Sequence, residues 1–408
     1  MTRRGLKIFI VDSVGEHRGM HYFNFPFACE LKEQGCEVVL FSTPQTQSSS
    51  LRPVNVDVKG VFRGIYDNRS KWVRGFNYVV ALIRIVLYCL IAKPDIVHFH
   101  FYQIPLVDLL TIYLLRWFSF KTVTSVHDVL PFHLSGGFNT FEGKIYHRLY
   151  KASSGLILHS EYARDLLHSL DPVFKKKTTL LPHGNYDLFI TSIEGARSTA
   201  GEAKVRLGLK PEERVLLIFG TVKPNKRLDW ALRAVHIVVA EHPNLKLLIV
   251  GKLQDRDITS DMRLAQALGL NDLVIWRTEK VSDRELVDYF TAADLVLFPY
   301  EWIYQSGAII MAMNFGKPVI ATAVGSNVDI IHSGVTGWLV PPGDEDKFAQ
   351  TIKQVLVDSE LSERLGRNAF LYVTRELSWK VIAQQALDYY LHLSGESPRI
   401  PQPAERKF

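Results

Sequence analysis

Short, almost uninterrupted runs of apolar residues recur along the whole sequence, and helix-like segments separate them. In the first half, LKIFIVDS and CEVVLFST flank one such segment, and PDIVHFHF, KTVTSVHD, GLILHS and TTLLPHG follow. Strands that are apolar on both faces are typical of parallel sheets covered by helices on either side. The pattern therefore predicts a doubly wound α/β domain.

The alternation of apolar runs and helix-like segments stops between Tyr186 and Val205, where Ser, Thr, Gly and Ala accumulate. This segment is predicted to connect two domains. The alternation resumes with the apolar runs RVLLIFG, LKLLIVG, LVIWRT, DLVLFPY and PVIATAV. A chain of 408 residues is also too long for one compact core. We predict α/β domains over residues 1–190 and 205–375 that face a central cleft, a closing helix over 376–394 and a disordered tail over 395–408.

The net charge of +6 suits anionic small ligands or an anionic membrane surface. No cluster of basic and aromatic residues favours nucleic acid. Cys29, Cys36 and Cys89 are too few and too badly spaced for a zinc site or a disulfide framework, so no metal is expected. The amino terminus lacks the apolar core of a signal peptide, and we predict a cytoplasmic protein.

The apolar run from Tyr78 to Lys93 contains Arg84 and is shorter than the roughly 20 residues that a membrane-spanning helix needs. It is predicted to be a buried helix. Lys71, Trp72 and their neighbours give this region the mixed character of a helix that lies at a membrane surface. Peripheral attachment to the inner face of the membrane is therefore a second hypothesis.

Polar residues and glycines follow several predicted strands of the first half. Gly15 and Gly19 precede a helix, where glycine lets backbone amides approach an anion closely. His98 and His100 end one strand, and His127 ends the next. His127 is the candidate for a hydrogen bond to a polar ligand.

The second half contains a candidate anion site. Lys223, Lys226 and Arg227 crowd the turn after Gly220, where they would neutralise a diphosphate leaving group as its bond to carbon breaks. Ser306 is predicted to cap a buried helix that begins GAIIMAMN, and the free amides at such a helix start bind anions. We therefore predict a diphosphate held between a helix start and two cations.

These segments together resemble the retaining glycosyltransferases of family 4, which have the GT-B fold. The resemblance rests on Gly19 and on PDIVHFH, VTSVHD, LILHSE, LLPHG, GTVKPNKRLD, AADLVLFPY, NFGKPVIAT, VGSNVDIIHSGVTGWLVPPGDEDKFAQTI and LSWKVIA. Each segment is a weak signal alone. Their occurrence in register along nearly the whole chain is a strong one.

The resemblance implies a nucleotide-sugar donor bound mainly by the second domain, with Lys226 and Lys223 on the diphosphate. It implies that Gly19 approaches the donor phosphates or the acceptor, and that His127 contacts the transferred sugar. Thr221 occupies a position where many relatives have arginine. The remaining donor-binding residues are carried over as Glu301, Gln305, Ser306, Gly307 and Ala308.

The sequence departs from the family at two positions. Ile303 and Met311 stand where family members have two glutamates separated by seven residues. Methionine does not accept hydrogen bonds from a ribose as a carboxylate does. Glu301 and Gln305 are the nearest polar substitutes.

The predicted function is transfer of a sugar, with retention at the anomeric carbon, from a nucleotide diphosphate to a glycan or lipid-linked acceptor. The expected role is the synthesis of cell-surface polysaccharide or glycolipid, without a cofactor. Two alternatives stay open: a catalytically inactive GT-B subunit that binds nucleotide-sugar, and a nucleotide-sugar epimerase.

Overall fold

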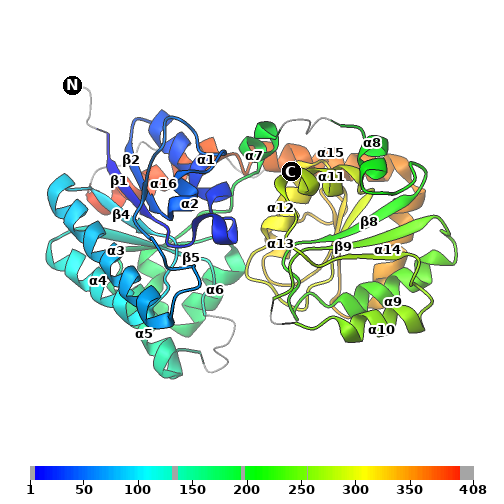
Figure 1. The fold of residues 1–408 in the computed structure, drawn as a ribbon, viewed down its shortest axis with the longest axis horizontal. Helices are drawn as coiled ribbons and strands as arrows, with labels where there is room; N and C mark the ends of the chain where they lie inside the picture. Colours follow the sequence, from blue (N-terminus) through cyan, green and yellow to red (C-terminus); the bar gives the residue numbers. More distant parts are fainter. Residues whose placement is uncertain (1–4, 131–136, 194–197, 255, 396–408) are drawn as a thin grey trace. The chain divides into compact units, whose positions relative to one another are not determined.

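The computed structural model describes residues 5–130, 137–193, 198–254 and 256–395. The chain forms two compact units (Figure 1). Unit 1 comprises Met1–His183 and Trp379–Phe408, and unit 2 comprises Gly184–Ser378. Apart from Gly395, the tail that was predicted to be disordered lies outside the described residues.

Unit 1 contains a parallel sheet, as the apolar runs predicted. Its described strands lie in the order β3 (Asp57–Gly60), β2 (Glu37–Ser42), β1 (Lys7–Val11), β4 (Ile96–Phe99), β5 (Lys121–Val126), β6 (Gly155–Leu158) and β7 (Thr178–Leu180). Every pairing is parallel. The order reverses direction between β1 and β4, and ligands of open α/β sheets bind at the strand ends near such a reversal.

Helices cover both faces of this sheet. They are α1 (His21–Glu33), α2 (Pro44–Gln47), α3 (Lys71–Ala92), α4 (Pro105–Trp117), α5 (Phe141–Ala152), α6 (Glu161–Leu170) and α16 (Trp379–Ser394), with 3₁₀ turns η1 (Gly15–Arg18), η2 (Gly137–Asn139) and η3 (Pro172–Lys177). Helices α3, α4 and α5 lie side by side (Figure 1). The predicted closing helix, α16, packs against α1 and belongs to unit 1.

Alternation along β1 explains why both faces are covered. Ile8 and Ile10 belong to a core cluster that also contains side chains of α1 and α16. Phe9 points the other way and packs against Phe41 at a centroid distance of 5.0 Å. Phe41 in turn contacts Tyr88 of α3, with centroids 5.3 Å apart. This strand, apolar at every position after Lys7, is thus buried on both sides.

Unit 2 contains a second parallel sheet. Its described strands lie in the order β10 (Val274–Arg277), β9 (Leu245–Val250), β8 (Arg214–Phe219), β11 (Leu295–Phe298), β12 (Val319–Thr322) and β13 (Trp338–Val340). The direction reverses between β8 and β11. The strand ends that adjoin this reversal carry the predicted anion site.

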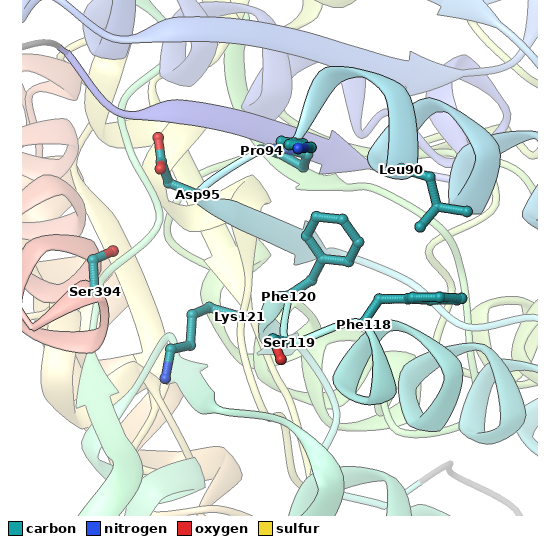
Figure 2. A pocket seen from close by; sticks show the side chains of 9 residues that line it. Leu90, Pro94, Asp95, Phe118, Ser119, Phe120, Lys121 and Ser394 are labelled. Carbon is teal, nitrogen blue, oxygen red and sulfur yellow. The ribbon is translucent and has the colours of Figure 1, made fainter.

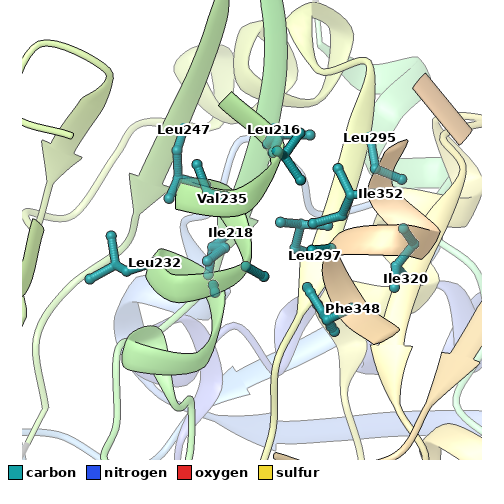
Figure 3. Close-up of a cluster of buried hydrophobic side chains, with 14 of the residues drawn as sticks. Leu216, Ile218, Leu232, Val235, Leu247, Leu295, Leu297, Ile320, Phe348 and Ile352 are labelled. Atoms are coloured by element: carbon teal, nitrogen blue, oxygen red, sulfur yellow. The ribbon is translucent and has the colours of Figure 1, made fainter. Parts of the chain in front are cut away.

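The helices of unit 2 surround its sheet. They are α7 (Asp187–Ser192), α8 (Ala200–Arg206), α9 (Leu228–Val239), α10 (Thr259–Ala267), α11 (Asp283–Ala292), α12 (Gly307–Asn314), α13 (Asn327–Ile330), α14 (Glu345–Val357) and α15 (Ser359–Arg375). In Figure 3, side chains of α9 and α14 pack over β8, β9, β11 and β12 as one buried cluster.

One prediction about organisation is wrong. The segment from Tyr186 to Val205 was predicted to connect the two domains, but its described residues include α7 and most of α8, both within unit 2. Thr199 caps α8 through a capping box with Glu202. The same small and polar residues that suggest a linker also cap short helices, so composition alone does not separate the two.

Candidate functional site

The turn after β8 holds a buried lysine. Gly220 has φ of 100°, a conformation that L side chains rarely adopt. Lys226 is 7% exposed, and its Nζ donates a hydrogen bond to the Phe219 carbonyl at 2.8 Å. A β-carbon added at Gly220 would lie 3.0 Å from this Nζ and 3.7 Å from the β-carbon of Ala308. The glycine therefore lets the lysine amine approach the start of α12.

Hydrogen bonds tie this turn to the loop that follows β11. Asn225 donates from Nδ2 to the Trp302 carbonyl at 2.8 Å and accepts from the Glu301 amide at 2.8 Å. Arg227 forms an ion pair with Glu301 at 3.3 Å. The cationic turn and the loop before α12 thus form one assembly, in which Thr221 is exposed to solvent.

Helix α12 is buried from Ile309 onward, as predicted, but the expected capping bond is absent. Ser306 is at the N-cap position and is 5% exposed, and its side chain accepts no bond from the helix amides. Its hydroxyl instead lies 3.2 Å from the Tyr300 hydroxyl. The first amides of a helix, here beginning with Gly307 and Ala308, have no partner within the helix. They remain available to an anion.

Two further observations make this place a candidate ligand site. The Nε2 atom of Gln305 is buried and has no hydrogen-bond partner, which is costly unless a ligand provides one. Burial lowers the pKa of Lys226 to about 7, with a smaller contribution from the charge of Lys223. A bound anion would offset both effects on the lysine.

The positions of the two missing family glutamates are occupied by apolar side chains. Met311 is 4% exposed on α12. The Ile303 carbonyl accepts a bond from the Ser326 amide, and the adjacent Gly325, with φ of 51°, packs directly against it. Neither residue supplies a carboxylate. Glu301, the suggested substitute, is held by Arg227.

The loop after β1 in unit 1 is organised by a buried carboxylate. Asp12 accepts bonds from the amides of Val14 and Gly15, both at 2.9 Å, and from Nδ2 of Asn24 at 2.7 Å. Burial raises the pKa of Asp12 to about 6, although these bonds lower it. Gly19 ends the following 3₁₀ turn with φ of 73°. Asp12 was not selected from the sequence, and its place directly after an apolar strand was the available signal.

Among the described residues, four histidine rings lie around Phe23 with centroids 5.2 to 6.2 Å from its own, and they are those of His100, His127, His159 and His183. The ring of His127, which follows β5, stacks on Phe101 with centroids 4.5 Å apart and on His159 at the same distance. Its Nε2 atom is buried without a hydrogen-bond partner. Burial, followed by the charges of His159, His100 and His183, holds the pKa of His127 well below 6.5. His127 is therefore a neutral hydrogen-bonding group with one unused ring nitrogen.

His98 and His100 have a different environment. His98 Nε2 lies 2.9 Å from the Ser125 hydroxyl, and its Nδ1 lies 2.8 Å from the Tyr390 hydroxyl of α16. His100 Nε2 lies 3.3 Å from the same Nδ1. These contacts join β4 to α16 within unit 1. They indicate a structural role for His98.

The buried histidines should make unit 1 sensitive to acid. An unfolded histidine titrates near 6.5, whereas burial lowers the pKa of His159 to about 4. Between these values the unfolded chain binds more protons, so stability falls as the pH falls. The raised pKa values of Asp12 and Asp108 act in the opposite direction.

The variant His159→Asn isolates the contribution of one histidine. Asparagine keeps a donor for the Leu181 carbonyl, which His159 contacts at 2.8 Å, but it does not titrate. We expect the slope of unfolding free energy against pH between 6.5 and about 4 to decrease by about 1 kcal/mol per pH unit. Denaturant titrations of both proteins across this range measure it. An unchanged slope would mean that His159 does not carry this pH dependence.

No group of three or more His, Cys, Asp or Glu side chains within the described ranges is arranged to hold a metal ion. That the reaction needs no cofactor stays a prediction.

Two doubly wound domains, with a cationic turn beside a buried helix start in the second, define the GT-B class of proteins. Comparison with known families gives two matches in chain order. Residues 18–185 match "Glycosyltransferase Family 4", and residues 200–371 match "Glycosyl transferases group 1". The chain belongs to glycosyltransferase family 4 and is a transferase of that family.

Individual relatives agree with this assignment. A D-inositol 3-phosphate glycosyltransferase from Nocardioides sp. is 27% identical over 413 residues, covering 94% of this chain and 87% of the relative. One of the same name from Streptomyces avermitilis is 30% identical over 241 residues, covering 57% of this chain and 50% of the relative. The chain therefore spans half the length of the latter protein.

The fold also matches a solved structure. Anabaena HepE, solved in complex with UDP-glucose, has a TM-score of 0.72 and 16% sequence identity, with 96% of this chain and 100% of HepE covered. At this identity the likeness concerns the fold.

Proposed function

We propose that this transferase moves a sugar from a nucleotide-diphosphate donor to a glycan or lipid-linked acceptor, with retention at the anomeric carbon. The observation that carries the proposal is the position of the buried Lys226 amine, which lies beside Gly220 and Ala308 at the start of α12. A buried amine and unpaired helix amides together favour a bound diphosphate.

In the proposed step, the bond between the anomeric carbon and the diphosphate oxygen breaks, and the electron pair leaves with the diphosphate. Lys226, Lys223 and the amides of Ser306, Gly307 and Ala308 stabilise the charge that develops on this leaving group. The acceptor hydroxyl attacks the same face of the sugar and transfers its proton to the departing phosphate oxygen. His127 is proposed to donate a hydrogen bond to the transferred sugar.

The nucleotide must be recognised without the two family glutamates. Gln305, whose Nε2 is a buried donor without a partner, is proposed to bind the nucleotide. HepE was solved with UDP-glucose, which supports testing uridine diphosphate and UDP-glucose first. The names of the two relatives make an inositol phosphate the first acceptor to test. A role in cell-surface polysaccharide or glycolipid synthesis is proposed on the resemblance alone.

A thermal unfolding screen tests the donor site. A ligand that binds only the native state raises the melting temperature. Uridine, adenosine, guanosine and thymidine diphosphates should be compared at equal concentration, with the corresponding monophosphates as controls. We expect one diphosphate to stabilise the chain more than its monophosphate. If no diphosphate gave any stabilisation, the proposed site would be wrong.

The lowered pKa of Lys226 predicts that diphosphate binding takes up a proton. In the free protein this pKa is about 7, and a bound diphosphate raises it. Above pH 7 the amine of the free protein is increasingly neutral, so affinity should fall as the pH rises, by up to about tenfold per pH unit. Calorimetry at pH 8 in buffers of different ionisation enthalpy measures the uptake. The variant Lys226→Met should abolish this proton uptake. If the variant took up as many protons as the wild type, a group other than Lys226 would bind the proton.

One observation favours a second candidate function. The apolar residues Ile303 and Met311 at the glutamate positions suit a subunit that binds nucleotide-sugar without turning it over. Such a subunit would pass the thermal screen but release no nucleotide from any donor.

A further inference from the structure

Helix α3 has an unusual outward face. By length and composition it is the one helix of the described residues that is apolar enough to cross a membrane. However, it connects β3 to β4, and it buries Tyr78, Leu82, Ile85 and Cys89 against unit 1. A helix held in this way lies on the surface of its domain. Its remaining apolar side chains therefore point outward.

Helices α3 and α4 together expose large apolar side chains. Trp72, Phe76 and Ile91 of α3 are 90%, 69% and 82% exposed, and Leu110 and Trp117 of α4 are 60% and 83% exposed. The outward face of a surface helix is normally polar. Because α3 and α4 lie side by side (Figure 1), these residues form one surface, here named the α3–α4 face. Exposed apolar surface on this scale marks an interaction site.

Every exposed charged side chain between Lys71 and Lys121 is a cation. The exposed cations between Lys71 and Lys121, all of which the structure describes, are Lys71, Arg84, Lys93, Arg116 and Lys121. Asp95 and Asp108 are the acidic residues of this segment, and they are half-buried and buried. The α3–α4 face thus offers apolar and cationic groups without an exposed carboxylate.

A pocket of about 420 Å³ continues the face where α3 and α4 end (Figure 2). Leu90 and Phe118, which are among the exposed apolar residues, line it together with Phe120. Lys93 and Lys121 contribute cations to the same lining, and Asp95, whose carboxylate accepts a hydrogen bond from the Lys7 amide at 2.7 Å, contributes an anion. Apart from this carboxylate and two serines, the lining has the aromatic, aliphatic and cationic groups of the face itself.

We propose that the α3–α4 face lies on the surface of an anionic lipid bilayer. Tryptophan and phenylalanine side chains enter the interfacial region of a bilayer, and lysine and arginine bind anionic headgroups. A second copy of the chain is a poorer occupant. A symmetric dimer through this face would bring cations against cations, with no exposed carboxylate to pair with them. This surface belongs to unit 1, whereas the candidate donor site is built from residues of unit 2, so the proposal does not depend on turnover.

Sedimentation with vesicles tests the proposal on the full chain. We expect binding to vesicles of phosphatidylcholine and phosphatidylglycerol, weaker binding to phosphatidylcholine alone, and weakening as the salt concentration rises. Brominated lipids should quench tryptophan fluorescence of the bound wild-type chain. Failure to bind the phosphatidylglycerol vesicles at low salt would overturn the proposal.

Two double variants separate the apolar and cationic contributions. Trp72→Ser with Trp117→Ser, and Lys71→Glu with Arg84→Glu, should each weaken binding to the anionic vesicles by at least about tenfold. All four side chains are exposed, so thermal unfolding should change little. The matched controls are Val357→Ser and Lys280→Glu, which change exposed residues of unit 2 and should bind as wild type does.

Three results would contradict the proposal. If both double variants bound vesicles like the wild type, the face would be excluded as the contact. If the controls lost binding equally, the attraction would be non-specific. If the wild-type chain were a dimer in solution that the tryptophan double variant converts to monomer, the face would be assigned to a second copy.

Discussion

Replacing Lys226 with methionine should lower turnover of the nucleotide-sugar donor by about 10²- to 10³-fold, because the charge on the departing diphosphate would lose a buried cation. Methionine retains the apolar stem beside Tyr300, whose ring centroid lies 5.6 Å from the lysine amine. Affinity for the free nucleoside diphosphate should fall as well. Steady-state kinetics and calorimetry measure the two effects.

Stability distinguishes this chemical effect from misfolding. Within the described part of the chain the buried amine makes one hydrogen bond, to the Phe219 carbonyl, and its pKa is lowered chiefly by burial. Its removal should therefore leave the melting temperature unchanged or raise it. Lys280→Met, at an exposed lysine of the same unit, is the control and should retain wild-type turnover. Wild-type turnover by Lys226→Met would exclude the lysine from the mechanism.

The second large effect is expected at Gly325. A β-carbon at this position would overlap the carbonyl oxygen of Ile303, in the loop that precedes α12. Since φ is 51°, alanine would also be strained there. We expect Gly325→Ala to lower the free energy of unfolding by about 2–4 kcal/mol and to weaken diphosphate binding by displacing this loop.

Gly208→Ala is the matched control. Gly208 has φ of 76°, but an added β-carbon would meet nothing within 4 Å. This variant carries the conformational strain without the overlap, and it should lose only about 1 kcal/mol and keep diphosphate affinity. Denaturant unfolding and calorimetry compare the two. Equal losses in both variants would mean that contact with Ile303 does not matter.

The fold was predictable because its strands are buried on both faces. Runs such as Lys7–Val11 and Leu245–Val250 are apolar at nearly every position, and parallel sheets under two helical layers require that pattern. The sequence did not indicate which unit would receive the last helix. The buried side chains of α16, including Trp379 and Ile382, would suit either sheet, and only tertiary packing decides between them.

The parts of the candidate site that could be predicted are the polar or charged residues and the helix start that come soon after a strand end. Lys226 and the start of α12 were both chosen in this way, and the structure brings them together beside Gly220. The hydrogen-bond partners of the site residues were not predictable. Ser306 does not cap α12, and its hydroxyl lies 3.2 Å from that of Tyr300.

Other parts of the site rest on contacts that no local pattern encodes. Asn225 joins the cationic turn to the loop at Trp302 across 77 residues of sequence. Gly325 sets the position of Ile303 through close backbone packing. Helix and strand periodicity carry no information about such pairs, because each residue alone is compatible with an ordinary loop.

Release of nucleoside diphosphate from a panel of nucleotide-sugars, measured with the purified full chain, tests most directly whether the site of unit 2 breaks the donor bond. Without acceptor, the wild-type chain should release nucleotide slowly from one donor. An added acceptor should accelerate this release, and Lys226→Met should suppress it. Saturable binding of a donor, with no release from any donor in the panel and none after acceptors are added, would contradict an enzymatic role and indicate a nucleotide-sugar-binding subunit.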